Sequence, residues 1–281
     1  MIAVTQPNSS KQSVYWSTCI FVLSVIVAVG QTAFAQNVDA HTALNPIASI
    51  ISVPFQNNVN FGVGADDKAQ DVLILQPVIP FRISKNWNLV SRWITPLVVQ
   101  PRLSPSLGPA TGLGNMQPQF YLTPAYAGKF IWGAGPQFFL PTAGGKTLGV
   151  NKWGGGPALA ALTIQGPWIA GALVNNVWAG SGPRRVNQLT FNPFVYYNFS
   201  RGWYLLSSPV MTEQWAARSG NRLTVPLGGG FGRLFRIDRL PANARMQVFR
   251  NAVHPDFAAG WTAQFQIQFL FPRGSAHRTG N

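Results

Sequence analysis

The sequence predicts an all-β protein, an antiparallel up-and-down transmembrane β-barrel of about 12 strands after a cleaved signal peptide. Three observations support this fold class. Apolar and polar residues alternate along many segments, and the connections between these segments alternate in length. After Ala48 no long segment has the i, i+3, i+4, i+7 spacing of an amphipathic helix.

The first residues have the order of a secretory signal peptide. Lys11 supplies a positive charge, residues 19–29 form an apolar run, and Ala33, Phe34 and Ala35 end in a small-x-small site. A membrane-anchor helix is the alternative, but the run is shorter than the roughly 20 residues that a spanning helix needs. We expect cleavage after Ala35.

This organisation divides the chain into four parts. We expect a signal peptide at 1–35, an N-terminal periplasmic segment at 36–49, the barrel at 50–271 and a C-terminal tail at 272–281.

The composition excludes some function classes. The only cysteine, Cys19, lies in the signal peptide, so disulfides and thiolate metal sites are not expected. The 21 Lys and Arg residues against 7 Asp and Glu give a formal net charge of +14. Basic residues are scattered, with only Arg184 and Arg185 paired, so we expect no nucleic acid partner. In an exported chain the expected anions are lipid head groups, lipopolysaccharide phosphates or a charged solute.

Gly, Pro, Asn, Asp and Ser residues bound each of the predicted strands. The twelve segments are 50–62, 71–84, 88–102, 112–125, 130–141, 153–165, 168–180, 188–200, 203–215, 221–237, 244–253 and 257–271.

The connections between these segments indicate the topology. Short connections such as residues 166–167 and 201–202 mostly alternate with longer ones such as 103–111 and 142–152. Outer-membrane barrels have short periplasmic turns, longer external loops and an even strand number. With twelve strands, the first and the last strand both have their free chain ends on the short-turn side.

The strand faces predict which side chains meet lipid. In residues 261–271, four apolar side chains alternate with three glutamines, and tryptophans gather near strand ends as in interfacial girdles. A soluble sandwich with aromatic caps is the alternative, although it does not need alternating loop lengths. The expected lipid-facing and girdle residues are Trp168, Trp178, Trp203, Trp215, Phe265, Ile267, Phe269 and Phe271.

The opposite faces predict a lumen rich in amides, with positive charge and almost no carboxylate. The expected lumen-lining residues are Gln56, Asn58, Gln76, Arg82, Arg92, Gln117, Gln119, Asn192, Asn198, Arg222, Gln264, Gln266 and Gln268.

Prolines inside the predicted strands do not fit this pattern. Proline removes a ladder donor, and a closed barrel has no edge strand to accommodate it. Bulges or bends at these positions are one way to absorb them. The residues are Pro77, Pro80, Pro96, Pro118, Pro136, Pro193, Pro209 and Pro226.

Several motifs recur in the order of a known family. They include "NPIASIISVPFQNNVNFGVG" from Asn45, "LQPVIPFRISKNWNLVSRWITPL" from Leu75, "WGAGPQFFLPTA" from Trp132 and "GPWIAGALVNNVWAG" from Gly166. The sequence resembles a bacterial outer-membrane protein family that carries the label neuromedin U, within the group named for the meta-pathway of phenol degradation. The resemblance covers about 45–272 and implies an outer-membrane barrel and passage of small molecules. It implies no catalytic residues, and the chain departs from outer-membrane barrels by continuing past Phe271.

Enzymatic and metal chemistry have little support. Of three histidines only His254 falls near a strand end, and no G-x-S-x-G or similar motif accompanies it. Asp66, Asp67 and Asp71 could make weak calcium contacts, but a solvated loop is the simpler reading. We expect no catalytic residue, no metal and no cofactor.

The predicted function is a narrow outer-membrane channel or transporter for small anionic or aromatic solutes. Two alternatives stay open: a plugged structural barrel without transport, and a lipid-modifying barrel enzyme. The expected partners are outer-membrane lipid, lipopolysaccharide, the barrel assembly machinery and a small-molecule solute. The sequence leaves the oligomeric state open.

Overall fold

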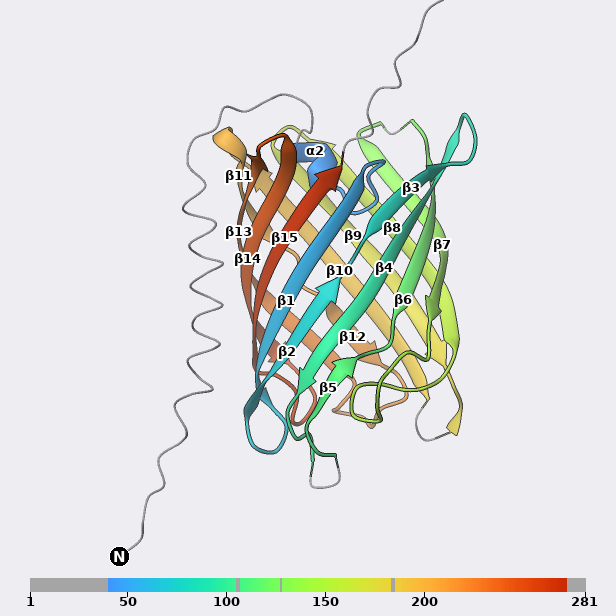
Figure 1. Ribbon diagram of the computed structural model, residues 1–281, viewed down its shortest axis with the longest axis vertical. Coiled ribbons are helices and arrows are strands. Elements are labelled where there is room, and N and C mark those ends of the chain that lie inside the picture. The colour runs from blue at the N-terminus through green and yellow to red at the C-terminus, as the bar shows by residue number, and fades with distance from the viewer. Residues whose placement is uncertain (1–39, 105–106, 127, 183–184, 272–281) are drawn as a thin grey trace, which may run out of the picture. The chain divides into compact units, whose positions relative to one another are not determined.

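The fold is one antiparallel sheet closed on itself (Figure 1). The computed structural model describes residues 40–104, 107–126, 128–182 and 185–271. The predicted signal peptide at 1–35 and tail at 272–281 lie outside these ranges. β15 pairs antiparallel with β1, from Ile51 opposite Phe271 to Phe61 opposite Trp261, and this pairing closes the barrel.

The wall contains fifteen strand segments in the described residues. They are β1 (Ile51–Val63), β2 (Lys68–Leu75), β3 (Val78–Arg82), β4 (Trp87–Gln100), β5 (Ala110–Leu113), β6 (Gln117–Pro124), β7 (Phe130–Phe139), β8 (Gly154–Gln165), β9 (Trp168–Ala179), β10 (Val186–Asn198), β11 (Trp203–Ser207), β12 (Met211–Gln214), β13 (Leu223–Ile237), β14 (Leu240–Val253) and β15 (Trp261–Phe271).

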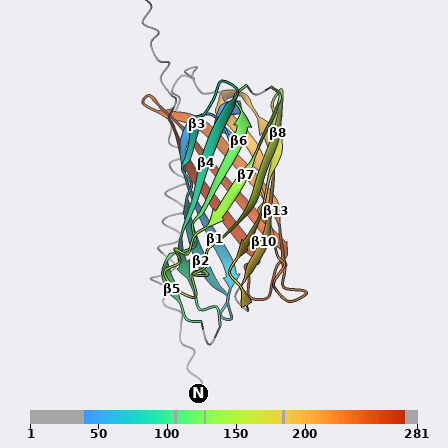
Figure 2. The same ribbon diagram turned by 90° about the vertical axis from the view of Figure 1, so that its right-hand side faces the viewer.

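Three of the wall strands are interrupted. β2 and β3 both pair with β1 and β4, β5 and β6 both pair with β4, and β11 and β12 both pair with β10 and β13. Each of these pairs is therefore one strand with a break, and the fifteen segments make the twelve-strand barrel that the sequence predicts. The strands run obliquely and cross in projection (Figure 2).

The breaks account for part of the proline pattern. Pro77 lies between β2 and β3, and Pro209 lies between β11 and β12. Pro96 stays inside β4, where its carbonyl accepts a hydrogen bond from Gly114 N at 2.9 Å. The proline nitrogen carries no hydrogen, so it cannot donate the reciprocal hydrogen bond to the Gly114 carbonyl. The Gly114 carbonyl instead accepts from Thr142 Oγ1 at 2.8 Å. A loop hydroxyl thus replaces the ladder donor that proline removes.

Some strand boundaries differ from the sequence prediction. β14 begins at Leu240 rather than at 244, because Asp238 adopts a positive φ of 52° and makes a tight turn in which Ile237 pairs with Leu240. β15 begins at Trp261 rather than at 257, since Phe257 also has a positive φ, of 60°, and lies in the preceding loop.

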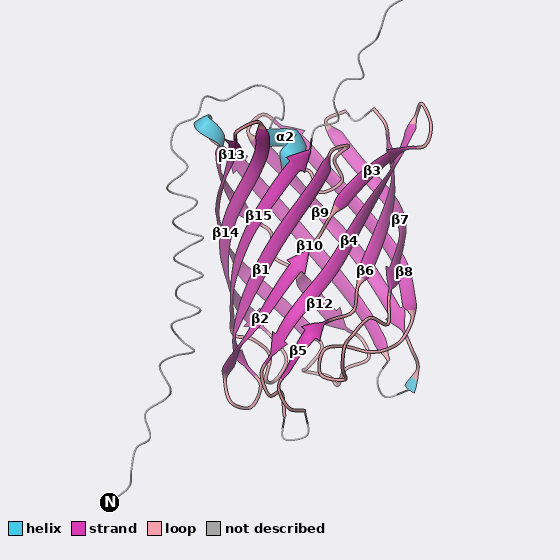
Figure 3. Ribbon diagram, in the orientation of Figure 1, coloured by secondary structure: helices cyan, strands magenta, loops and turns pink. Residues whose placement is uncertain are grey.

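Helix contributes little to the described residues (Figure 3). α2 (Ala40–Ala43) lies at the end of the barrel where β15 ends and the β3–β4 turn lies, here called the short-turn end (Figure 1). No helix in the described ranges is long and apolar enough to cross a membrane.

The residues after α2 form part of the interior. Residues 43–50, here called the inner segment, bury Leu44 and Ile47, which pack with Val90 and Tyr121 of the inner wall. A Cβ at Gly133 of β7 would lie 3.3 Å from Ile47 Cδ1. The inner segment therefore occupies space inside the barrel near the short-turn end.

The outer surface is apolar. Large hydrophobic side chains from all around the wall are exposed on it, including Phe55, Leu97, Phe138, Leu159, Leu205 and Leu227. A water-soluble protein buries such side chains, whereas a barrel that spans a membrane presents them to lipid.

Candidate functional site: the polar interior

Side-chain amides line the inner face where β14, β15 and β1 meet. Gln247 Nε2 donates to Gln264 Oε1 at 2.6 Å, and Gln264 Nε2 donates to Asn58 Oδ1 at 3.1 Å. Gln56 Nε2 donates to the same Asn58 oxygen at 3.1 Å. These residues share a face because they fall on alternating positions of antiparallel strands in register.

Arg245 of β14 projects from this lining toward the barrel interior. Its Nη2 donates to Gln266 Oε1 at 2.7 Å and to Gln56 Oε1 at 3.4 Å. Its Nη1 donates to the Tyr196 hydroxyl of β10 at 3.0 Å. Its Nε is buried and has no hydrogen-bond partner. The guanidinium therefore contacts only neutral acceptors, and its Nε has none.

Arg92 of β4 has a similar environment. Its Nη2 donates to Gln76 Oε1 at 2.7 Å, and its Nη1 donates to Gln119 Oε1 at 3.2 Å. Gln119 Nε2 in turn donates to Gln137 Oε1 at 2.8 Å, and Gln137 Nε2 donates to Gln117 Oε1 at 2.7 Å. A chain of amides thus fixes Arg92 against β6 and β7.

Carboxylates are absent from both arginine environments in the described residues. Asp66, Asp67, Asp238 and Asp256 lie in connections between strands. Asp71 pairs with Val59 and Val99, and Glu213 pairs with Leu189 and Leu223, and these positions lie on the outward parity of their strands. The two interior guanidinium charges are therefore not neutralised by any described side chain.

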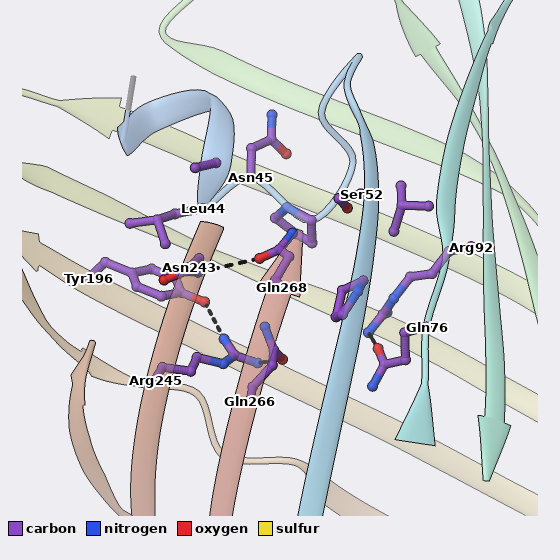
Figure 4. A pocket seen from close by; sticks show the side chains of 14 residues that line it. Leu44, Asn45, Ser52, Gln76, Arg92, Tyr196, Asn243, Arg245, Gln266 and Gln268 are labelled. Atoms are coloured by element: carbon purple, nitrogen blue, oxygen red, sulfur yellow. Dashed lines mark hydrogen bonds between the residues drawn. The ribbon is translucent and has the colours of Figure 1, made fainter. Parts of the chain in front are cut away.

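A cavity lies beside the two arginines (Figure 4). The volume open to the centres of water molecules is about 80 Å³, several times what one water requires. Arg245, Gln266, Arg92 and Gln76 line it from the wall, and residues 43–46 border it from the inner segment. Arg245 and Arg92 reach it from opposite sides of β1, which lies between them in the strand order.

The remaining interior is closely filled. The side chains of Gln137 and Gln247 are 1% and 0% exposed, and apolar groups such as Leu162, Ile169 and Leu206 form one cluster with the inner segment. The structure therefore shows a narrow, largely occupied interior rather than a wide pore.

The loop of residues 140–153 also enters the barrel, at the end opposite the short turns. Asn115 Nδ2 donates to the carbonyls of Leu140 and Val150, each at 2.7 Å, and Val150 packs against Phe139 and Val177 of the inner wall. The interior is thus narrowed at both ends, by this loop and by the inner segment.

The structure brings together most of the residues that the sequence predicts for the lumen. Gln56, Asn58, Gln264 and Gln266 belong to the Arg245 environment, and Gln76, Gln117 and Gln119 belong to that of Arg92. Gln268 Oε1 accepts from Asn243 Nδ2 at 3.3 Å beside the same cavity.

Four of the predicted lumen residues lie apart from this cluster. Asn192 Nδ2 donates to the Pro209 carbonyl at 2.7 Å at the break between β11 and β12. Asn198 Nδ2 donates to the Pro167 carbonyl at a short turn, and Arg82 Nε donates to the Ser84 carbonyl at another. Arg222 precedes β13, is exposed and donates to the Ala217 carbonyl, so it lies in a loop rather than in a strand.

Sequence reasoning missed Arg245, Gln247, Asn243 and Gln137. The signal was available in β14, where Asn243, Arg245 and Gln247 occur at every second position between Ala, Met and Val. The prediction started this strand at 244 and assigned no face to it. In β7, Gln137 stands alone among apolar residues and glycines, so no alternation marked it.

The residues predicted to face lipid lie on the outer side of the wall, within their strands or, for Trp215, directly after β12. Trp168, Trp178 and Trp215 are exposed, and Trp168 packs edge-on against Tyr197 with ring centroids 4.7 Å apart. Trp203 stacks under the Arg233 guanidinium at 5.1 Å. Phe271 is exposed, and Ile267 and Phe269 are partly exposed. Phe265 is 8% exposed, since its strand neighbours Asn57 and Met246 flank it.

No cluster of three or more potential metal ligands occurs in the described ranges. His254 is exposed at the end of β14, and its Nδ1 lies 2.9 Å from the Pro255 carbonyl.

The closed wall, the apolar outside and the polar inside together define the class as a twelve-strand barrel of the outer-membrane type. An outer membrane channel from Pseudomonas putida F1 has the same fold, with a TM-score of 0.62, 14% identity and coverage of 85% of this chain and 100% of that chain. The NanC porin is similar with a TM-score of 0.50 and 9% identity, covering 79% of this chain and 100% of that chain. Likeness at these identities shows the fold alone.

Outer membrane phospholipase A from Escherichia coli has a TM-score of 0.42 and 12% identity over 85% of this chain and 99% of that chain, too distant to bear on activity. No family model matches the sequence, and no curated protein matches it either. Membership of the family that the sequence resembles therefore stays a prediction.

Proposed function

We propose that the chain is a narrow outer-membrane channel that admits small anionic solutes. The observation that carries this proposal is the pair Arg92 and Arg245, whose charges face the interior with amide and phenol partners and without a carboxylate from any described residue. Positively charged groups along a narrow passage attract anions and repel cations.

Two further features support this function. The exposed hydrophobic side chains on the outside suit a lipid environment, with lipid and lipopolysaccharide as partners. The similar barrel from Pseudomonas putida F1 is an outer membrane channel, and the whole of that chain is covered. Insertion by the barrel assembly machinery and membership of the neuromedin U-labelled family belong to the same proposal.

The experiment is a planar-bilayer recording on the purified, folded chain under a salt gradient. We expect small conductance steps with a reversal potential on the anion-selective side. The variant Arg245→Gln removes one interior charge and should move the reversal potential toward zero. Arg222→Gln removes an equal charge from a loop where the side chain donates only to the Ala217 carbonyl, and is the matched control. Equal shifts in both variants would contradict an interior origin of the selectivity.

A plugged structural barrel is the second candidate, because Gln137 and Gln247 are almost fully buried and the inner segment packs into the core. A folded, inserted barrel that never conducts would favour this candidate over the channel.

A further inference from the structure

We propose that the cavity beside Arg92 and Arg245 is a binding site for a small carboxylate anion with a short apolar tail. Such a site rests on the proposed anion channel and adds a saturable binding step to it. The cavity lies between the inner wall of the barrel and residues 43–46 of the inner segment.

The charge of the site favours an anion. Arg92 and Arg245 both line the cavity, and their positive charges repel a cation there. Their hydrogen-bond acceptors are the neutral oxygens of Gln76, Gln119, Gln266, Gln56 and Tyr196. Charge-assisted hydrogen bonds from a guanidinium to a carboxylate are roughly twice as strong as those between neutral groups. A carboxylate in the cavity would therefore form stronger hydrogen bonds with these arginines than their present neutral partners do.

The donor geometry also points to a ligand. Arg245 Nε is buried without a hydrogen-bond partner, and an unsatisfied buried donor is costly. A guanidinium presents its donors in a planar fork that matches the two oxygens of a carboxylate. Arg245 uses both terminal nitrogens for neutral oxygens, so a carboxylate that replaces the weakest of these contacts gains a charge-assisted hydrogen bond in its place. The weakest of these contacts is the 3.4 Å hydrogen bond to Gln56.

The size and the apolar lining select a small organic anion. The volume of the cavity that is open to the centres of water molecules is about 80 Å³, which is too small for large solutes. Leu44 and Val78 border it together with Pro54, so part of its surface cannot solvate an inorganic oxyanion. A carboxylate whose short alkyl group contacts these side chains satisfies both the polar and the apolar part of the cavity.

The test uses propionate as the probe and propionamide as its uncharged analogue of nearly the same shape. The full folded chain in detergent is titrated with each compound, and binding is followed by saturation-transfer difference NMR. We expect saturable binding of propionate and at least tenfold weaker binding of propionamide. Equal binding of the two compounds, or no saturable binding of propionate, would overturn the site.

Variants locate the binding. Arg245→Gln and Arg92→Gln should each weaken propionate binding at least tenfold, whereas Arg82→Gln, which removes a charge hydrogen-bonded to Ser84 at a short turn, should leave it unchanged. Arg245→Lys keeps the charge but loses the fork, and should give intermediate affinity. Heat-modifiable gel mobility confirms that each variant is folded before it is compared. Unchanged affinity in folded Arg245→Gln and Arg92→Gln would also overturn the site.

The bilayer recording separates this site from the proposed function. Anion-selective conductance without saturable propionate binding would overturn the site and leave the channel standing. Propionate binding by a barrel that does not conduct would support the site and contradict the channel.

Discussion

Asn115 and Val150 are joined by two reciprocal hydrogen bonds: Asn115 Nδ2 donates to the Val150 carbonyl and Val150 N donates to Asn115 Oδ1, both at 2.7 Å. Asn115 lies at the break between β5 and β6, and Val150 belongs to the loop of residues 140–153. One wall side chain therefore holds this loop inside the mouth of the barrel.

Removing this connection should widen the long-loop end. Asn115→Ala loses both hydrogen bonds to Val150 and the one to the Leu140 carbonyl, so the loop can leave the interior. We expect a larger and noisier single-channel conductance in planar bilayers. Asn198→Ala is the matched control, since Asn198 binds the Pro167 carbonyl at the opposite end. An Asn115→Ala channel identical to wild type would show that the loop does not restrict the passage.

The inner segment should restrict the short-turn end. Leu44 and Ile47 are 5% and 2% exposed and pack into the main core cluster. The double variant Leu44→Ala and Ile47→Ala removes much of the apolar contact that retains the segment, so open-channel conductance should rise. Leu205→Ala truncates a leucine that is 53% exposed on the outer face and should not change conductance. A rise in the control alone would contradict the assigned positions.

Gly232 of β13 should tolerate no side chain. A Cβ there would overlap the ring and hydroxyl of Tyr204, which is buried and donates its hydroxyl hydrogen to Asn243 Oδ1 at 2.6 Å. Gly232→Ala should displace the ring and lower the free energy of unfolding by about 1–3 kcal/mol. Denaturant titration of the detergent-solubilised barrel measures this change. Gly108→Ala, at a position with open space around the added Cβ, should be neutral by comparison.

Leu159 tests the lipid-facing surface. It lies near the middle of β8 and is 53% exposed. If this face meets the bilayer core, Leu159→Arg should destabilise the inserted barrel by roughly 2–4 kcal/mol. Leu159→Phe keeps the site apolar and should cost little. The readout is reversible unfolding in lipid vesicles, and a neutral Leu159→Arg variant would place the bilayer elsewhere.

The fold could be predicted because a barrel strand carries its own signature. In β15 the glutamines at 264, 266 and 268 mark one face and the apolar residues the other, and the structure places Gln264 and Gln266 inside. Such a pattern depends only on neighbours along the chain, and it is repeated in many of the strands. The positions of the three breaks could not be predicted: Pro77 and Pro209 lie in two of them, but Pro96 stays inside β4, and the sequence does not distinguish these cases.

The site could be predicted only in part, for a related reason. The alternation predicted which way Arg92 and Gln119 point, but not that their partners come from the break between β2 and β3, from β6 and from β7. Arg222 shows the limit at strand ends, where its position outside β13 removes it from the alternating pattern. The loop and inner segment that narrow the interior have no strand periodicity at all, so tertiary contacts alone reveal them.

The closure of β15 on β1 has a consequence for the order of folding. The pairing of Ile51 with Phe271 joins residues at the two ends of the wall, and side-chain bonds such as Gln264 to Asn58 and Thr262 to Asn60 reinforce it. Closing a loop this long costs more chain entropy than pairing a sequential hairpin, so such contacts form slowly. The seam is therefore expected to be the last part of the wall to form, and the rate of barrel formation should depend on its amides more than on those of any sequential hairpin.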